Sequence, residues 1–147
     1  MLEINAIIEH AAATIRAMPE MEGVPVIEVH KGNVVKNLEI AVAKTRFAVL
    51  VGWNGFKARS NSSKTIVGDT NLVVEIYEMP LINAGGVAHS DDGPKLLPAA
   101  RAIANAVNLS QPPGQSPIVF SEIAPVSEPR PGTISTNVIF SVSNSTL

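Results

Sequence analysis

The chain has 147 residues, a formal net charge of −2 at pH 7 and no cysteine. This charge gives no basic footprint for sequence-independent binding of nucleic acid or of a membrane surface, and a chain without cysteine has no disulfide, thiolate nucleophile or cysteine-based metal site. The length suits one domain, and a composition that is 46% hydrophobic but only 4% aromatic predicts an aliphatic core.

The first residues are not typical of a signal peptide, because Glu3 and Glu9 interrupt their apolar pattern. The longest apolar run, residues 47–53, is too short to cross a bilayer as a helix. We therefore expect a soluble protein that is made and assembled in the cytoplasm.

The first third of the chain predicts two helices around a short strand. Apolar residues recur at helical spacing over residues 2–17, which predicts an amphipathic helix that Pro19 ends. Residues 24–30 predict a strand, and its proline suits a strand start or a sheet edge. Residues 34–43 combine a helical stripe with the strand preference of Val and Ile; we predict a helix capped by Asn33.

The centre of the chain predicts a hairpin of two strands. Residues 47–53 are apolar on both faces, as in a strand covered on both sides, and residues 72–79 alternate. The segment between them, 54–70, is rich in Gly, Asn and Ser, so we predict a long mobile loop. Before Asp69 its only charges are basic: Lys57, Arg59 and Lys64.

After the hairpin, residues 79–93 contain too many glycines and prolines for a regular element and predict a second contact loop. A second amphipathic helix is expected over residues 95–108. Its start remains open between Pro94 and Leu97, since Pro98 would remove a backbone hydrogen bond inside a helix.

The last third predicts strands separated by proline-rich connections. We expect a strand at 118–123, a turn at 125–132 and a strand with one buried face at 133–143, followed by a loose polar tail. The fold class predicted from all elements is a single α+β domain over residues 1–147. It has a mixed, mostly antiparallel sheet of about five strands packed with two to three amphipathic helices.

No motif of catalysis or cofactor binding is found in the sequence. The histidines His10, His30 and His89 are not spaced as ligands of one metal ion, and the only local cluster of candidate ligands runs from His89 to Asp92. A polar loop is the expected reading of that cluster. The serines and glycines match no nucleophile elbow, phosphate loop or dinucleotide fingerprint. We therefore expect no enzyme activity, no catalytic residue, no cofactor and no metal ion.

A protein without such motifs acts through contacts, and a few residues are candidates for them. Trp53, the single tryptophan, is expected in the core, with an interface as the alternative. The three basic residues of the 54–70 segment either contact phosphates or an acidic protein surface, or are simply solvated. The candidate interface residues are Trp53, Lys57, Arg59, Lys64, His89 and Asp91.

The order of these elements, together with segments 47–55 and 71–80, resembles the small tail terminator, or tail-completion, proteins of long-tailed bacteriophages, including Mu-like prophages. The resemblance extends over nearly the whole chain and includes no sequence motif. It implies a virion structural protein that forms a six-fold ring, a homohexamer, on the tail tube, ends tube polymerisation and provides the surface that joins the head. The implied partners are other copies of the chain, the tail tube protein and a head–tail connector or neck protein, with DNA passing through the ring.

Other interpretations stay open at this point. One is another head–tail joining protein, or a capping subunit of a phage-derived contractile device. A second, from a different class, is a small-molecule-binding α+β domain with a pocket near Trp53 and the loop 80–93. A hydrolase with dispersed catalytic residues is a third.

Overall fold

The computed structural model describes residues 1–60, 64–80 and 95–147. The predicted contact loop 79–93 therefore lies largely outside the described residues. The same is true of two of the candidate interface residues, His89 and Asp91.

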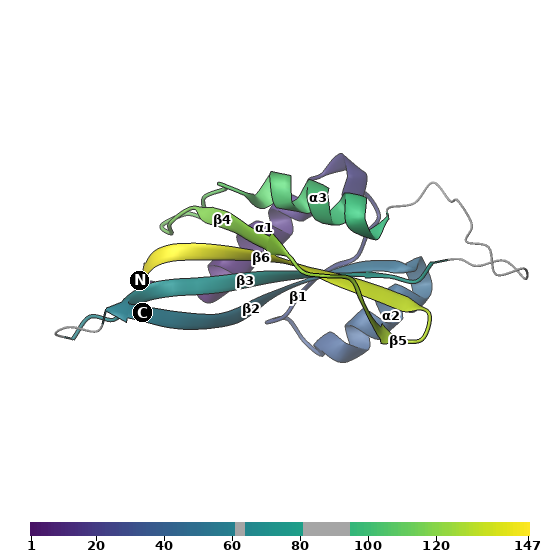
Figure 1. Cartoon of the computed structure of the whole chain (residues 1–147), viewed down its shortest axis with the longest axis horizontal. Coiled ribbons are helices and arrows are strands. Elements are labelled where there is room, and N and C mark those ends of the chain that lie inside the picture. Colours follow the sequence, from purple (N-terminus) through teal and green to yellow (C-terminus); the bar gives the residue numbers. More distant parts are fainter. Residues whose placement is uncertain (61–63, 81–94) are drawn as a thin grey trace, which may run out of the picture.

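The described residues form an α+β fold, as predicted (Figure 1). The strand order is β1-β2-β3-β6-β4, with β5 also paired to β6; β1 runs parallel to β2 and every other pair is antiparallel. The helices are α1 (Ile4–Arg16), α2 (Val34–Thr45) and α3 (Leu96–Val107), with a short 3₁₀ turn, η1 (Pro19–Met21). The strands are β1 (Val26–Glu28), β2 (Phe47–Ser60), β3 (Val67–Glu78), β4 (Ile118–Ile123), β5 (Ser127–Arg130) and β6 (Thr133–Thr146).

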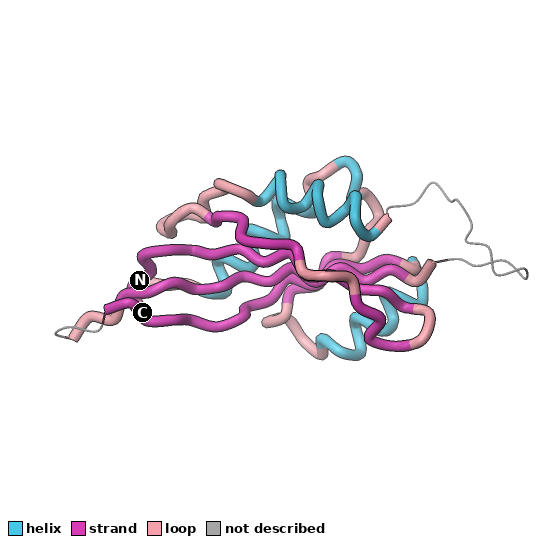
Figure 2. The backbone as a smooth tube through the Cα atoms, in the orientation of Figure 1, coloured by secondary structure: helices cyan, strands magenta, loops and turns pink. Residues whose placement is uncertain are grey.

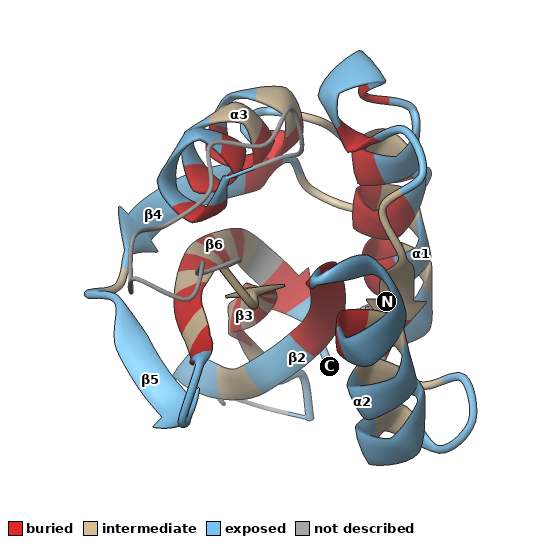
Figure 3. Cartoon of the chain, turned by 90° about the vertical axis from the view of Figure 1, so that its right-hand side faces the viewer, coloured by how far each residue is buried: buried red, intermediate tan, exposed pale blue. Residues whose placement is uncertain are grey.

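One face of the sheet carries the core, and α1 and α3 cover it. Strand residues that face the same way meet across the ladder, for example Val74 of β3 beside Val51 of β2 and Val138 of β6. Alternation along each strand puts these side chains inside, and each contributes about 1.5–3 kcal/mol by leaving water. Figure 3 shows the buried residues of the helices turned towards the sheet. Helix residues with at most 2% exposure are Ile7, Ile8, Ala11, Ala12 and Ile15 of α1, and Ala100, Ile103 and Val107 of α3.

Helix α2 lies on the opposite face of the sheet, over the end that contains Leu50 and Tyr77. The Asn33 side chain accepts a hydrogen bond from the backbone N–H of Lys36 at 3.2 Å, which is the predicted N-cap. The helix ends at Arg46 in the left-handed conformation, with φ of 60°. The prediction of a helix here, rather than a strand, is confirmed.

Helix α3 begins at Leu96, between the two starts that the sequence left open. Pro98 then falls in the first helical turn. The backbone N–H groups of that turn have no partner inside the helix, so a proline there removes no hydrogen bond.

The prediction of a loop over residues 54–70 was wrong. Strand β2 continues to residue 60 and β3 begins at residue 67, with Lys57 paired to Asp69 (Figure 2). A bulge between Trp53 and Phe56, where Gly55 has φ of +102°, bends the ribbon without ending it. Gly55 and Gly68, which suggested a loop, therefore belong to the two paired strands, whereas residues 61–63 lie outside the described residues.

Two predictions at the end of the chain also need correction. The turn at 125–132 contains a short strand, β5, which pairs with β6. The tail after residue 143 is not loose, because β6 continues to Thr146 beside Val67. The backbone N–H of Leu2 donates to the Thr146 carbonyl at 2.6 Å, and that of Leu147 donates to the Ile66 carbonyl at 2.9 Å. These backbone bonds order the last residues of the chain. The segment has too few apolar residues for its order to be predicted from the sequence.

Candidate functional site

The sheet extends past the helices as an arm, made of residues 54–60 of β2, 67–71 of β3 and 143–146 of β6, together with residues 64–66 and Leu147 (Figure 1). Both ends of the described chain lie at this end of the sheet. At Gly68 a Cβ atom would come within 2.2 Å of the Lys57 carbonyl oxygen, so the two strands approach closely only because this residue is glycine.

Trp53 lies at the base of the arm and is 45% exposed, so its predicted core position was wrong. Its indole Nε1 donates to the Thr70 hydroxyl at 2.6 Å, and that hydroxyl donates to the Gly55 carbonyl at 3.1 Å. The ring borders Ile4 and Ile8 at the start of α1, where the helical cover of the sheet ends. Trp53 is therefore a fixed, half-exposed aromatic side chain, as found at the energetic centres of interfaces.

The structure brings Lys57, Arg59 and Lys64 together with Trp53 on the arm, and all three basic residues are exposed. The Arg59 guanidinium lies 3.2 Å from the Asp69 carboxylate. Such an exposed pair contributes about 0–1 kcal/mol, so the arm charges matter more for contacts than for the fold.

A cluster that the sequence did not predict joins α1 to the edge of the sheet. The ring nitrogen Nε2 of His30 lies 3.3 Å from Oε1 of Glu9 and 3.8 Å from Oε1 of Glu28. One ligand-type atom from each residue falls within 4.8 Å of the other two. The Glu28 side chain is only 3% exposed, whereas that of Glu9 is 55% exposed.

Two cations hold the other oxygen of Glu28. Arg16 donates to Oε2 at 2.9 Å and Lys31 donates to it at 3.2 Å. Burial alone would raise the pKa of Glu28, but these two partners outweigh burial and hold the pKa below its ordinary value. Oε1 of Glu28 and Nδ1 of His30 are buried without a hydrogen-bond partner. The cluster therefore keeps unused lone pairs in its interior.

Part of this cluster had a sequence signal. Glu28 ends β1 and His30 lies in the turn that follows, so the two are close neighbours in the chain. Glu9 carried no signal, because its position against β1 depends on how α1 packs on the sheet. The spacing of the three histidines does not reveal the cluster.

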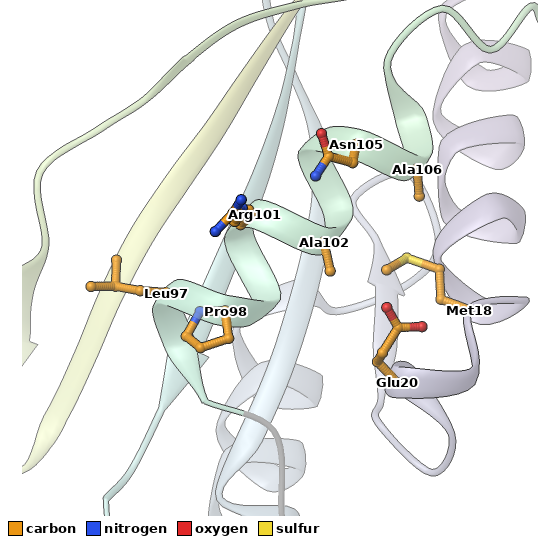
Figure 4. A pocket seen from close by; sticks show the side chains of 8 residues that line it. All are labelled: Met18, Glu20, Leu97, Pro98, Arg101, Ala102, Asn105 and Ala106. Atoms are coloured by element: carbon orange, nitrogen blue, oxygen red, sulfur yellow. The ribbon is translucent and has the colours of Figure 1, made fainter.

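Two hollows on the described surface bear on the small-molecule interpretation. A cavity of about 400 Å³ lies between α2 and β5, lined mainly by apolar residues that include Leu38, Val42 and Pro129, and by Thr133, whose buried hydroxyl has no partner. An open cleft of about 800 Å³ separates α3 from η1. In Figure 4, Met18 and Glu20 face α3 across this cleft. The small-molecule interpretation thus finds its cavity beside α2, since the space next to Trp53 is closed.

No family model and no curated protein matches the chain. Among the described residues, every helix is too short or too polar to cross a membrane.

Proposed function

We propose that the chain is a ring-forming structural subunit of a virion, of the tail-terminator type, which caps the tail tube, ends its polymerisation and joins it to the head. One observation supports this more than any other. Two separate groups of exposed apolar side chains lie on opposite sides of the molecule.

The first group, the β4 surface, follows the edge strand β4 and its flanks. The backbone N–H of Leu109 donates to the Ile118 carbonyl at 2.6 Å, which places the end of α3 beside this strand. Five large apolar side chains here are between 36% and 68% exposed: Leu109, Val119, Phe120, Ile123 and Val126. Residues 108–110 already bond the backbone of β4 at Ile118 and Phe120, so it is the exposed apolar side chains that offer a surface to another chain.

The second group, the α2 surface, lies beside β1 and on α2, which covers the face of the sheet opposite α1 and α3. It consists of Val29, which follows β1, and of Val35 and Ile40 on α2, with exposures of 39%, 67% and 54%. Figure 3 shows β4 and α2 on opposite sides of the molecule. Together the two surfaces hold eight of the thirteen exposed large apolar side chains of the described residues.

Two different surfaces on opposite sides of the molecule suit a ring. A closed ring of more than two copies is built from heterologous contacts, in which one surface of a subunit binds a different surface of the next. A two-fold dimer would instead bury the same surface twice and leave the other exposed. The number six comes from the resemblance to tail terminators.

The experiment measures assembly by native mass spectrometry and negative-stain microscopy, and we expect rings of about six copies. Val119→Lys in the β4 surface and Ile40→Lys in the α2 surface should each give monomers, because each removes one half of every contact. Leu97→Lys is the matched control, since Leu97 is 57% exposed on α3 and belongs to neither surface. A stable monomer of the unmodified chain at high concentration would refute the proposal.

Mixing the two variants distinguishes a ring from a dimer. The Val119→Lys protein keeps its α2 surface and the Ile40→Lys protein keeps its β4 surface, so the mixture should form one-to-one pairs and nothing larger. If Ile40→Lys alone still dimerises, the contact uses the β4 surface twice and the ring is wrong.

The arm is the proposed contact with the tail tube or the neck protein. We expect Lys57→Glu with Arg59→Glu to keep the fold, because both side chains are exposed, and to impair docking or assembly. Normal docking and normal assembly of the double variant would remove the arm from the contact surface.

The cavity beside α2 supports a second candidate function, the binding of a small apolar molecule. Its volume of about 400 Å³ lies within the range of ligand pockets, and its lining is mainly apolar. Filling it by Val42→Phe should abolish binding of a fluorescent apolar probe. A monomer that binds such a probe tightly would favour this function over the ring.

A further inference from the structure

We propose that Glu9, Glu28 and His30 bind a divalent transition-metal ion, which fastens α1 to the β1 edge of the sheet. This inference is independent of the ring. It rests on the positions of three ligand atoms and on the unused lone pairs of a buried carboxylate.

The distances suit one metal ion. Bonds of about 2.0–2.2 Å from zinc to imidazole nitrogen and carboxylate oxygen place neighbouring ligand atoms about 3.4 Å apart in a tetrahedral site. Nε2 of His30 lies 3.3 Å from Oε1 of Glu9 and 3.8 Å from Oε1 of Glu28. The Glu9 side chain is exposed, so a change of its rotamer would bring a carboxylate oxygen to bonding distance of the ion.

The buried carboxylate points to a ligand. Oε1 of Glu28 has no partner, although the side chain is 3% exposed, and a buried charged oxygen without a partner is costly. Arg16 and Lys31 both bind Oε2, so they leave Oε1 free to coordinate. They also hold the carboxylate in place, as outer partners of a metal ligand do.

The local charge permits a cation. The groups that face the site are two carboxylates, the imidazole, the Arg16 guanidinium and the Lys31 ammonium. With a neutral imidazole their charges cancel, so no net positive charge opposes the ion, and the bonds from the two carboxylates and the imidazole would hold it. Imidazole favours zinc or a neighbouring transition metal over magnesium or calcium, which take oxygen ligands.

Such an ion would strengthen a weak point of the fold. Strand β1 has only three residues and lies at the sheet edge, so few ladder bonds hold it. A metal bound by α1 on one side and by residues 28 and 30 on the other would cross-link them. Three protein ligands leave a fourth position for water or for a side chain of a neighbouring copy.

The test uses the full chain, freed of metal by a chelator and titrated with zinc. We expect one ion per chain by calorimetry, and at a hundredfold excess over Kd a melting temperature raised by roughly 5–10 °C. Cobalt in place of zinc should give the visible absorption of a four-coordinate ion. No saturable binding at one ion per chain would overturn the proposal.

Variants locate the site. Glu9→Gln is exposed and leaves the fold intact, and it should weaken zinc binding at least about tenfold, as should His30→Gln and Glu28→Gln. The controls are His10→Gln and His89→Gln, which remove the other two histidines and should keep full affinity. Affinity that survives in His30→Gln, or that disappears in either control, would assign the ion to another site and overturn the inference.

Discussion

Replacing Ile103 with aspartate tests the core directly. Ile103 is fully buried on α3, within the core cluster that joins α1 and α3 to the sheet. Removing its side chain from the core costs about 1.5–3 kcal/mol in transfer alone. A buried polar group without a partner adds about 2–7 kcal/mol. The sum reaches the whole free energy of unfolding of a typical domain, about 5–15 kcal/mol, so we expect Ile103→Asp to be unfolded.

Milder changes at the same position make the result quantitative. Ile103→Val should lower the free energy of unfolding by about 0.5–1.5 kcal/mol and Ile103→Ala by about 2–5 kcal/mol. Urea unfolding followed by circular dichroism measures both. Asn105→Asp is the control, because Asn105 is exposed on the same helix and the change leaves helix propensity nearly constant.

One result would refute the packing of α3 on the sheet through Ile103. In that result Ile103→Asp stays folded and melts within a few degrees of Asn105→Asp. A loss of stability that is equal in the two variants would point to the helix rather than to the core.

Three further predictions concern the backbone, a cap and pH. Gly68→Ala should destabilise the protein by more than about 1 kcal/mol, because the new methyl group meets the backbone of β2, whereas Gly52→Ala should be tolerated, since its nearest neighbour is 3.6 Å away. Asn33→Ala should cost about 1 kcal/mol, seen as a melting temperature lower by about 2–4 °C. Burial raises the pKa of Glu75 despite its bond to Tyr77, so its ionisation weakens the fold as pH rises through that pKa; Glu75→Gln should gain melting temperature over the natural protein at about pH 7 but not at about pH 4.

The sequence predicted those elements that bury one face. Along β6, the alternation that ends in Phe140 and Val142 follows from a sheet with helices on one side. The stripe around Ile103 follows from a helix that packs on that sheet. In both cases tertiary burial imposes the period, so the period can be found without the structure.

The arm could not be predicted in this way. Lys57, Ala58 and Arg59 are all exposed, so no burial imposes alternation on β2 beyond the bulge. Its strands pair through backbone groups, which every residue except proline provides. Composition then suggested a loop, although Gly55 and Gly68 are the residues that let the strands bend and approach each other.

The candidate metal cluster could not be predicted from the sequence for a different reason. Glu28 and His30 are close because they are two residues apart in the chain. Only the packing of α1 on the sheet brings Glu9 to them. A site built from separate elements has no spacing in the sequence. The two apolar surfaces could not be predicted either. Only the fold places α2, which carries Ile40, and β4, which carries Val119, on opposite sides of the molecule.

The arm and the two surfaces differ in how much the fold depends on them. The arm is anchored by backbone pairing and by the Trp53–Thr70 hydrogen bond at its base, so the charges further along it are not needed for folding. Substitutions in the two apolar surfaces likewise leave the core intact, because the side chains there are partly exposed. Function by contact therefore predicts a class of variants, such as Val119→Lys and Lys57→Glu, that keep the melting temperature and lose assembly. An enzyme or a small-molecule binder would tolerate these same changes, which makes the separation of stability from assembly the property that distinguishes the proposed ring from its alternatives.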